Sequence, residues 1–232
     1  HPDKKDHPLH DNTISHTDYN KVVECYKDKI FCKSEKKSNN KKPKIAVTKR
    51  NRRKIFTCMR KIANFGKINN YHKFDKSVFN KDKLINDLND ASPKILQLLN
   101  NINELDKKDM QTHNKKFKHF IFSDVKEGGY GAKILASALI AFGFKNVIKA
   151  RKVPGVKKLK LYIDNDLSKD GKNFGLLCSN SIYNSNFNEK LKKELLKLFN
   201  ERPGNINGNK LRFIIFDSGF KEGIDLFDVK YV

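Results

Sequence analysis

The sequence is short of acidic residues, of apolar residues and of closely spaced cysteines. Its 26 Asp and Glu residues oppose 49 Lys and Arg residues, which gives a formal net charge of +23. The hydrophobic content of 38% is below the usual globular range, so we expect one real core and a basic, solvated remainder. A charge this far from neutral favours a polyanion as partner, most simply DNA or RNA. The alternative is a lysine- and asparagine-rich composition that carries part of this charge without any binding role.

Several familiar patterns are missing as well. The four cysteines are widely spaced and none belongs to a C-x-x-C pair, so neither a zinc ribbon nor a disulfide framework is indicated. No apolar run approaches the length of a transmembrane helix, and no signal-peptide pattern is visible. The Walker A pattern G-x-x-x-x-G-K-[ST] is absent, as is any Ser-His-Asp or Cys-His set with supporting context. The sequence therefore offers no catalytic residue and no metal site of its own.

Composition divides the chain near residue 91. Residues 1–90 are polar and basic, with an almost purely polar run over 33–44, and we expect them to be partly helical or disordered. Two helices are expected there, over 19–31 and over 48–65, the second followed by Gly66 at its C-terminal end. The basic face of the second helix suits phosphate contacts and plain solvation equally. The chain begins at His1 rather than Met, as expected of a processed chain or of a piece of a longer one.

Residues 91–232 alternate strand-like and helix-like patterns. Ser92-Pro93 is a typical helix start, and Asn188 is the expected cap of a helix over 189–200. A glycine-rich turn opens an apolar helix over 132–142, which ends at Gly143. Strands are expected over 117–123, 147–148, 159–163, 174–178, 211–216 and 229–232. This alternation indicates β-α-β units, so the predicted fold is α/β with a parallel sheet flanked by helices.

Polar segments follow three of these strands. Because the carboxyl ends of parallel strands meet at one edge of a sheet, we expect the strand ends at Ser123, Cys178 and Phe216 to lie together. After Ser123, the glycine-rich turn and the helix start favour a bound anion, although a plain turn is the alternative. After Cys178, the hydroxyls of Ser179 and Ser181 suit phosphate oxygens, or simply a loop.

The third segment, D-S-G-F-K-E-G-I-D over 217–225, is the most informative. Gly219 and Gly223 permit tight turns and close approach of a backbone to a ligand, and Asp225 suits ribose hydroxyls. An ordinary strand-exit loop is the alternative. His119 lies inside a strand pattern, where a packed role is more common than a catalytic one.

Residues 92–232 resemble the second RecA-like lobe of superfamily 2 helicases. The resemblance is nearest to the Snf2-like helicases of nucleo-cytoplasmic large DNA viruses, such as the poxvirus early-transcription-factor ATPase and its relatives in African swine fever virus and giant viruses. It rests on K-H-F-I-F-S-D (118–124, motif IV), G-G-Y-G-A-K-I-L-A-S-A-L (128–139), L-L-C-S-N-S-I-Y (176–183) and E-G-I-D-L (222–226, motif V). Glu222 stands where DEAD-box proteins usually carry Arg, which favours the Snf2-like branch.

The resemblance implies specific roles. Glu222, Gly223 and Asp225 would help to close an ATP site. A nucleic-acid surface would be formed by Ser123, Lys126, Tyr130, Lys133, Ser179 and Ser218. ATP and Mg²⁺ would serve only a full-length parent, because motifs I, II and VI are missing from this sequence. On its own this chain is not expected to hydrolyse ATP.

The implied partners are the backbone phosphates of DNA or RNA, together with viral RNA polymerase or other virion proteins, and no membrane. The implied location is the virion or the host cytoplasm. The alternative reading is a non-enzymatic basic protein that binds nucleic acid or builds the virion and has a helicase-derived fold. The lysine-rich first half and the missing ATPase motifs favour that alternative.

Overall fold

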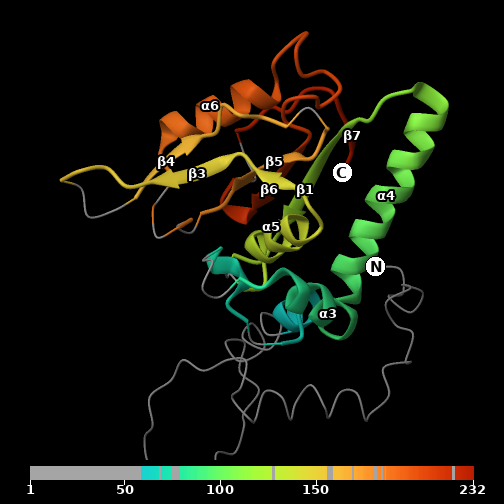
Figure 1. Cartoon of the computed structure of the whole chain (residues 1–232), viewed down its shortest axis with the longest axis vertical. Coiled ribbons are helices and arrows are strands. Elements are labelled where there is room, and N and C mark those ends of the chain that lie inside the picture. Colours follow the sequence, from blue (N-terminus) through green and yellow to red (C-terminus); the bar gives the residue numbers. More distant parts are fainter. Residues whose placement is uncertain are drawn as a thin grey trace, which may run out of the picture. The chain divides into compact units, whose positions relative to one another are not determined.

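In the computed structural model, five parallel strands form a central sheet in the order β2-β5-β6-β1-β7 (Figure 1). The strands span Lys118–Ser123 (β1), Lys145–Asn146 (β2), Asn173–Leu177 (β5), Phe213–Asp217 (β6) and Val229–Tyr231 (β7). Every residue of β5 and β6 is buried, because these two strands lie inside the sheet and are covered on both faces. The predicted α/β class with a parallel sheet flanked by helices is thereby confirmed.

The structure describes residues 59–67, 69–74, 79–126, 129–155, 159–168, 170–179, 182–183, 185, 187–220 and 223–232. Within this part, Lys61–Val232 form one compact unit. The helix expected over 19–31 lies outside the described residues, and so does most of the helix expected over 48–65. Residues 61–64 are helical, in line with the end of that second prediction.

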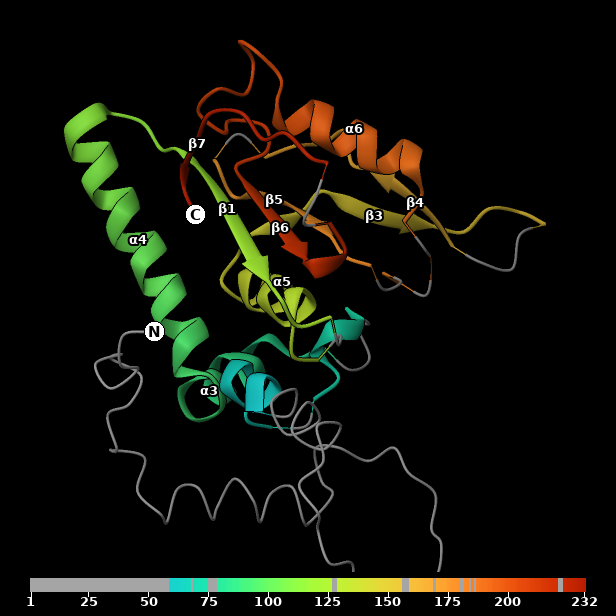
Figure 2. The same ribbon diagram turned by 180° about the vertical axis from the view of Figure 1, so that it is seen from behind.

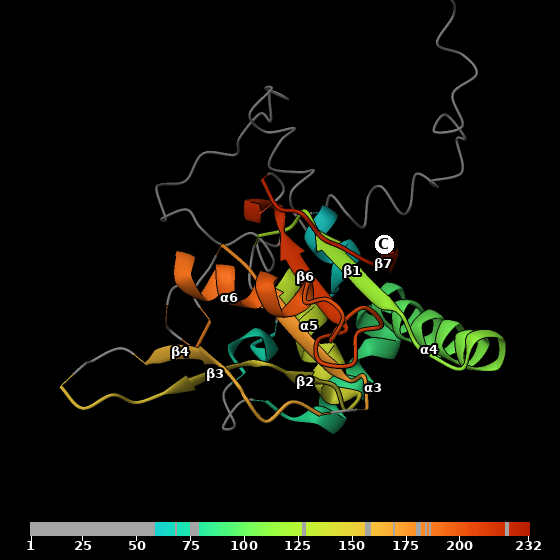
Figure 3. The ribbon, with the colours of Figure 1, turned by 90° about the horizontal axis from the view of Figure 1, so that it is seen from above.

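Helices α5 (Ala132–Ala141) and α6 (Glu189–Phe199) cover opposite faces of the sheet (Figure 3). This follows from the strand order, because β1-α5-β2 and β5-α6-β6 cross the sheet in opposite directions with the same right-handed connection. Helix α6 is amphipathic and buries Leu191, Leu195 and Phe199. A Cβ at Gly175 in β5 would lie 2.9 Å from Leu195, so glycine lets this helix approach the strand closely.

Helix α5 is buried almost all round, because its outer side is covered in turn. Helix α3 (Lys81–Ala91) and the short 3₁₀ helix η3 (Tyr71–Lys73) pack against it. The Ser137 hydroxyl of α5 lies 3.0 Å from the carbonyl oxygen of Tyr71 and 2.9 Å from that of Lys133, the two acceptors within reach of its one proton. Because α5 is covered on nearly all sides, its sequence is apolar on nearly all sides and has no polar face. As predicted, the helix ends before Gly143, which has a φ of +88°.

Helix α4 (Pro93–His113) runs beside the end of the sheet that β1 and β7 form (Figure 2). It starts as the sequence predicts, with the Ser92 hydroxyl accepting from the Ile95 amide at 3.3 Å and Pro93 in the first turn. Near its other end, the buried Asp109 carboxylate accepts from Lys230 at 2.7 Å and from the Tyr231 hydroxyl at 2.9 Å. These bonds tie the helix to β7 and hold the pKa of Asp109 below its usual value, against the opposing effect of burial.

One feature differs from the sequence prediction. The strands expected over 147–148 and 159–163 do not extend the parallel sheet. Instead, β3 (Ile148–Arg151) and β4 (Lys160–Ile163) pair with each other as an antiparallel hairpin, while β2 ends just before β3. The compact unit itself begins at Lys61. Residues 61–90 contribute Phe65, Tyr71, Leu84 and Leu88 to the core. The charged residues around these positions make the composition of the segment polar, so the composition does not indicate these core residues.

Candidate functional site

Three strand ends meet at the carboxyl edge of the sheet, as predicted. Ser123 of β1 lies opposite Asp217 of β6, and Leu177 of β5 lies opposite Phe216 of β6. The segments that follow these strands therefore start side by side. They bring together Ser123, Ser179 and Ser218, three of the side chains expected to contact nucleic acid.

Asp217 organises this edge. Its side chain is 1% exposed, and one carboxylate oxygen accepts from both the amide and the hydroxyl of Ser179 at 2.7 Å each. The other oxygen accepts from the Gly219 amide at 2.8 Å. A buried carboxylate with three donors is a stable arrangement, because the hydrogen bonds replace the lost solvation. Asp217 thus fixes the loop after β5 to the loop after β6.

Gly219 is required by this contact. A Cβ at this position would lie 2.6 Å from the Cβ of Ser179 and 2.9 Å from a carboxylate oxygen of Asp217. Any larger residue must therefore push the two loops apart. The close approach that the sequence assigns to Gly219 is thus made to the protein's own loop. Gly223 is different, since it has a φ of +69° and no atom of the described residues lies within 4 Å of its Cβ position.

The hydroxyls of Ser123, Ser179 and Ser218 differ in the hydrogen bonds that each can still make to a ligand. Ser179 donates its only proton to Asp217, so toward a ligand it can only accept. The Ser123 hydroxyl accepts from the Val125 amide at 3.3 Å and is 5% exposed. The Ser218 hydroxyl donates to the carbonyl of Asp124 at 3.3 Å, which is long for such a bond. Ser218 can therefore turn toward a phosphate oxygen at the lowest cost.

The glycine-rich turn before α5 is held by hydrogen bonds from two asparagine side chains. The Asn69 side-chain amide donates to the carbonyl of Gly129 at 2.8 Å, and the Asn64 amide donates to that of Tyr130 at 2.9 Å. A Cβ at Gly129 would lie 3.3 Å from Asn69 and 3.4 Å from Nδ1 of His72. These asparagines and the histidine come from residues that composition assigns to the polar first part, so the sequence gives no signal for them.

The other predicted residues are distributed as follows. Lys126 is exposed on the segment after β1, and Tyr130 is half-buried. Lys133 is 8% exposed in α5, and its charge, together with burial as the larger cause, lowers the pKa of His72. Glu222 lies outside the described residues.

Asp225 is exposed but lies apart from the serines. Its carbonyl accepts from the side-chain amide of Asn200 at 2.8 Å, just beyond the C-terminal end of α6. Because α6 runs from the end of β5 back to the start of β6, this end of the helix lies at the amino edge of the sheet. The structure therefore groups Ser123, Ser179 and Ser218 and holds Asp225 toward the opposite edge.

A second polar cluster lies at that amino edge, around Arg212. Its guanidinium donates to Asp106 through both terminal nitrogens, one of them at 2.9 Å, and its Nε donates to the carbonyl of Phe117 at 2.9 Å. Further contacts reach the carbonyl of Gly171 at 3.4 Å and Nε2 of His119 at 3.2 Å. All five N–H groups of Arg212 thus have a partner inside the protein. This side chain is 1% exposed and joins the start of β6 to α4, to β1 and to the segment before β5.

The fold and the edge define a basic α/β domain with a polar, loop-built surface at the carboxyl ends of parallel strands. No match was found among protein families, curated proteins or solved structures. Within the described residues, no three His, Cys, Asp or Glu side chains gather as metal ligands. None of the helices in that same part of the chain is both long and apolar enough to span a membrane.

Proposed function

We propose that residues 91–232 are the second RecA-like lobe of an ATP-dependent DNA or RNA helicase or translocase of the viral superfamily 2 type. The observation that carries the proposal is the meeting of Ser123, Ser179 and Ser218 at one sheet edge, on a chain of net charge +23. Nucleic acid would lie across this edge and contact it mainly through backbone phosphates. Lys126 would add a charge beside the serines.

ATP and Mg²⁺ would belong to the full-length parent. Two features of the segment that would face the nucleotide support this: no described atom lies within 4 Å of the Cβ position of Gly223, and Asp225 is exposed. Glu222 would act beside them. By the same resemblance, the carboxylate that holds Mg²⁺ would come from the other lobe. The expected partners in the virion or host cytoplasm, such as viral RNA polymerase, belong to the same proposal.

Binding as a function of salt tests the nucleic-acid part directly. A labelled single strand and a labelled duplex would be titrated with the full chain by fluorescence anisotropy. Affinity should fall steeply between about 50 and 200 mM salt and depend little on sequence. Affinity that does not change with salt would contradict the proposal.

Two variants of equal charge locate the surface. Lys126→Gln removes a positive charge at the carboxyl edge, and Lys197→Gln removes one from the exposed last turn of α6, at the amino edge. Lys126→Gln should weaken binding and lower the salt slope by about one phosphate contact. Lys197→Gln should change neither beyond the loss of general charge. Equal effects would mean that binding follows net charge alone.

The alternative is a non-enzymatic basic protein that binds nucleic acid or builds the virion. It is favoured by the absence of Walker A, Walker B and motif VI sequences from these 232 residues. The intact mass and peptide map of the native protein separate the two. Peptides from a Walker A lobe and from a motif VI segment would support the helicase, and a native chain that matches these residues alone would support the basic binding protein.

A further inference from the structure

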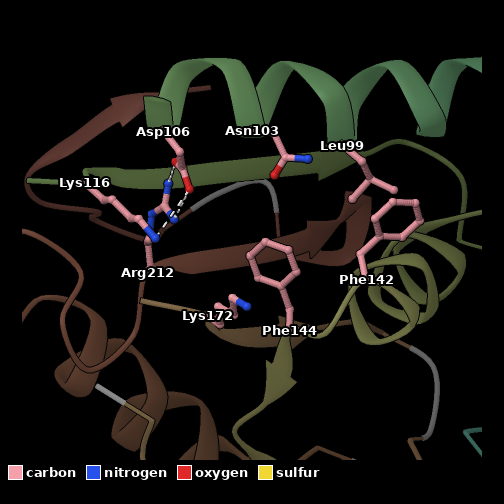
Figure 4. A pocket seen from close by; sticks show the side chains of 8 residues that line it. All are labelled: Leu99, Asn103, Asp106, Lys116, Phe142, Phe144, Lys172 and Arg212. Carbon is pink, nitrogen blue, oxygen red and sulfur yellow. Dashed lines mark hydrogen bonds and ion pairs between the residues drawn. The ribbon is translucent and has the colours of Figure 1, made fainter. Parts of the chain in front are cut away.

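A cavity of about 190 Å³ lies at the amino edge of the sheet, under the middle of α4 (Figure 4). Leu99 of α4 forms part of its apolar wall. The rest of that wall comes from Phe142 and Phe144, in the segment that joins α5 to β2. Phe144 is held in place by an edge-on contact with Phe213, with ring centroids 5.1 Å apart. The cavity is remote from the serines at the carboxyl edge.

The polar wall of the cavity is positively charged. Arg212, Lys116 and Lys172 line it, against the single carboxylate of Asp106. Arg212 and Asp106 form a two-pronged ion pair, so their charges offset each other. Lys116 forms an ion pair with Asp106 at 3.8 Å, which is beyond hydrogen-bond distance, and Lys172 comes from the segment before β5. With three positive groups against one carboxylate, the lining keeps an excess of positive charge that suits a negatively charged ligand.

Arg212 itself cannot take that ligand, because all of its N–H groups are used inside the protein. Its part is to fix Asp106 in the wall. Asn103 of α4, which is exposed and also lines the cavity, adds an amide to its polar lining. Figure 4 shows Leu99, Asn103 and Asp106 pointing from α4 into the same space as the two phenylalanine rings.

We propose that this cavity binds a small organic anion with one aromatic ring, such as an aromatic carboxylate. The size sets the class, because an apolar cavity of about 150 Å³ holds benzene, and the present cavity adds room for one acid group. Larger ligands, such as nucleotides, need about 300 Å³ or more. The ring packs against Leu99, Phe142 and Phe144, and the carboxylate faces Lys116 and Lys172. The site is independent of the proposed nucleic-acid edge.

Benzoate is the probe that tests the site on the full chain. With about nine non-hydrogen atoms, it should bind with a dissociation constant of about 0.1–1 mM. In a ¹H–¹⁵N correlation spectrum, the amides of Leu99, Asn103 and Phe144 should shift together along one binding curve. Benzyl alcohol keeps the ring without the charge, and acetate keeps the charge without the ring. Each should bind about tenfold more weakly than benzoate.

Variants then assign the two halves of the site. Lys172→Gln and Lys116→Gln should each weaken benzoate binding about tenfold, and Lys193→Gln on the exposed face of α6 should leave it unchanged. Asn103→Phe should fill the cavity and abolish binding, and an unchanged circular dichroism spectrum would show that the fold is kept.

Several results would overturn the proposal. These are an absence of shifts at saturating benzoate, equal binding of benzoate and benzyl alcohol, or equal binding of benzoate and acetate. Shifts confined to residues outside the cavity would overturn it too, and so would an equal loss of affinity in Lys193→Gln and Lys172→Gln. None of these results bears on binding of nucleic acid at the carboxyl edge.

Discussion

Acidification should destabilise this protein through one histidine, His119. The ring is 4% exposed in β1 and stacks on Phe213 at 4.7 Å between centroids. A guanidinium has donors and no acceptor, so the 3.2 Å contact of Arg212 with Nε2 of His119 makes this nitrogen the acceptor and the ring neutral. Burial, and then the charge of Arg212, lower the pKa of His119 to about 4, despite the opposing charges of Asp106 and Asp109.

The sign and size of the effect follow from linkage. The unfolded chain has a histidine pKa of about 6.5, so between about pH 6.5 and 4 the unfolded state binds more protons than the folded state. The stability contributed by the neutral ring is complete above pH 6.5 and is lost as the pH falls toward 4. Over the whole window the loss is about 3 kcal/mol, of which about 2 kcal/mol falls between about pH 7 and pH 5.

The assay is urea unfolding of the wild type and of His119→Gln at these two pH values, followed by circular dichroism. The glutamine oxygen can still accept from Arg212 but does not titrate, while all other titrating groups are shared. At pH 7 the variant should be less stable, because it loses the stacking on Phe213. At pH 5 the gap should shrink by about 2 kcal/mol. A gap that stays constant within about 0.5 kcal/mol would refute the reasoning, and so would an NMR titration of His119 with its midpoint near 6.5.

Three further predictions concern stability at neutral pH and are checked by the same urea unfolding. Gly219→Ala should cost about 1–3 kcal/mol, because its Cβ would lie 2.6 Å from that of Ser179, whereas Gly223→Ala should cost only about 1 kcal/mol of backbone strain. Asn205→Ala should cost about 2–4 kcal/mol, because this fully buried side chain bonds the carbonyls of residues 199 and 211 and the amides of residues 210 and 211. Asn188→Ala should cost about 1 kcal/mol, because the side chain caps α6 through a 2.8 Å bond.

Local signals in the sequence predicted the elements that depend on local chemistry. Ser92 and Asn188 predict helix starts because each side chain accepts a hydrogen bond from an amide in the first turn. Pro93 adds to the signal because its ring suits the first helical position. The apolar runs that became β5 and β6 were recognised because central parallel strands are buried on both faces. From these strands alone, the meeting of three strand ends could be predicted, since parallel strands share a carboxyl edge.

Contacts between segments that are distant in the sequence could not be predicted from it. The pairing of β3 with β4 depends on which neighbour each short strand finds, and its residues carry no sign of an antiparallel partner. The neutral state of His119 depends on burial in the folded core and on Arg212, which is 93 residues away. The position of Asp225 depends on Asn200, whose side chain holds the chain at the amino edge. In each case the deciding partner lies outside any window over which periodicity or turn chemistry can be read.

The direction of the hydrogen bonds at the carboxyl edge limits how nucleic acid could lie there. Phosphate oxygens only accept, and Ser179 has already given its proton to Asp217. If the edge tracks a backbone as proposed, phosphate contacts therefore fall to Ser218, to Lys126 and to backbone amides. Ser179 is suited instead to a donor on the ligand, and the ribose 2′-hydroxyl is the donor that a sugar backbone offers. In such a complex, the buried carboxylate of Asp217 would decide which part of the backbone Ser179 could contact, without itself facing the ligand.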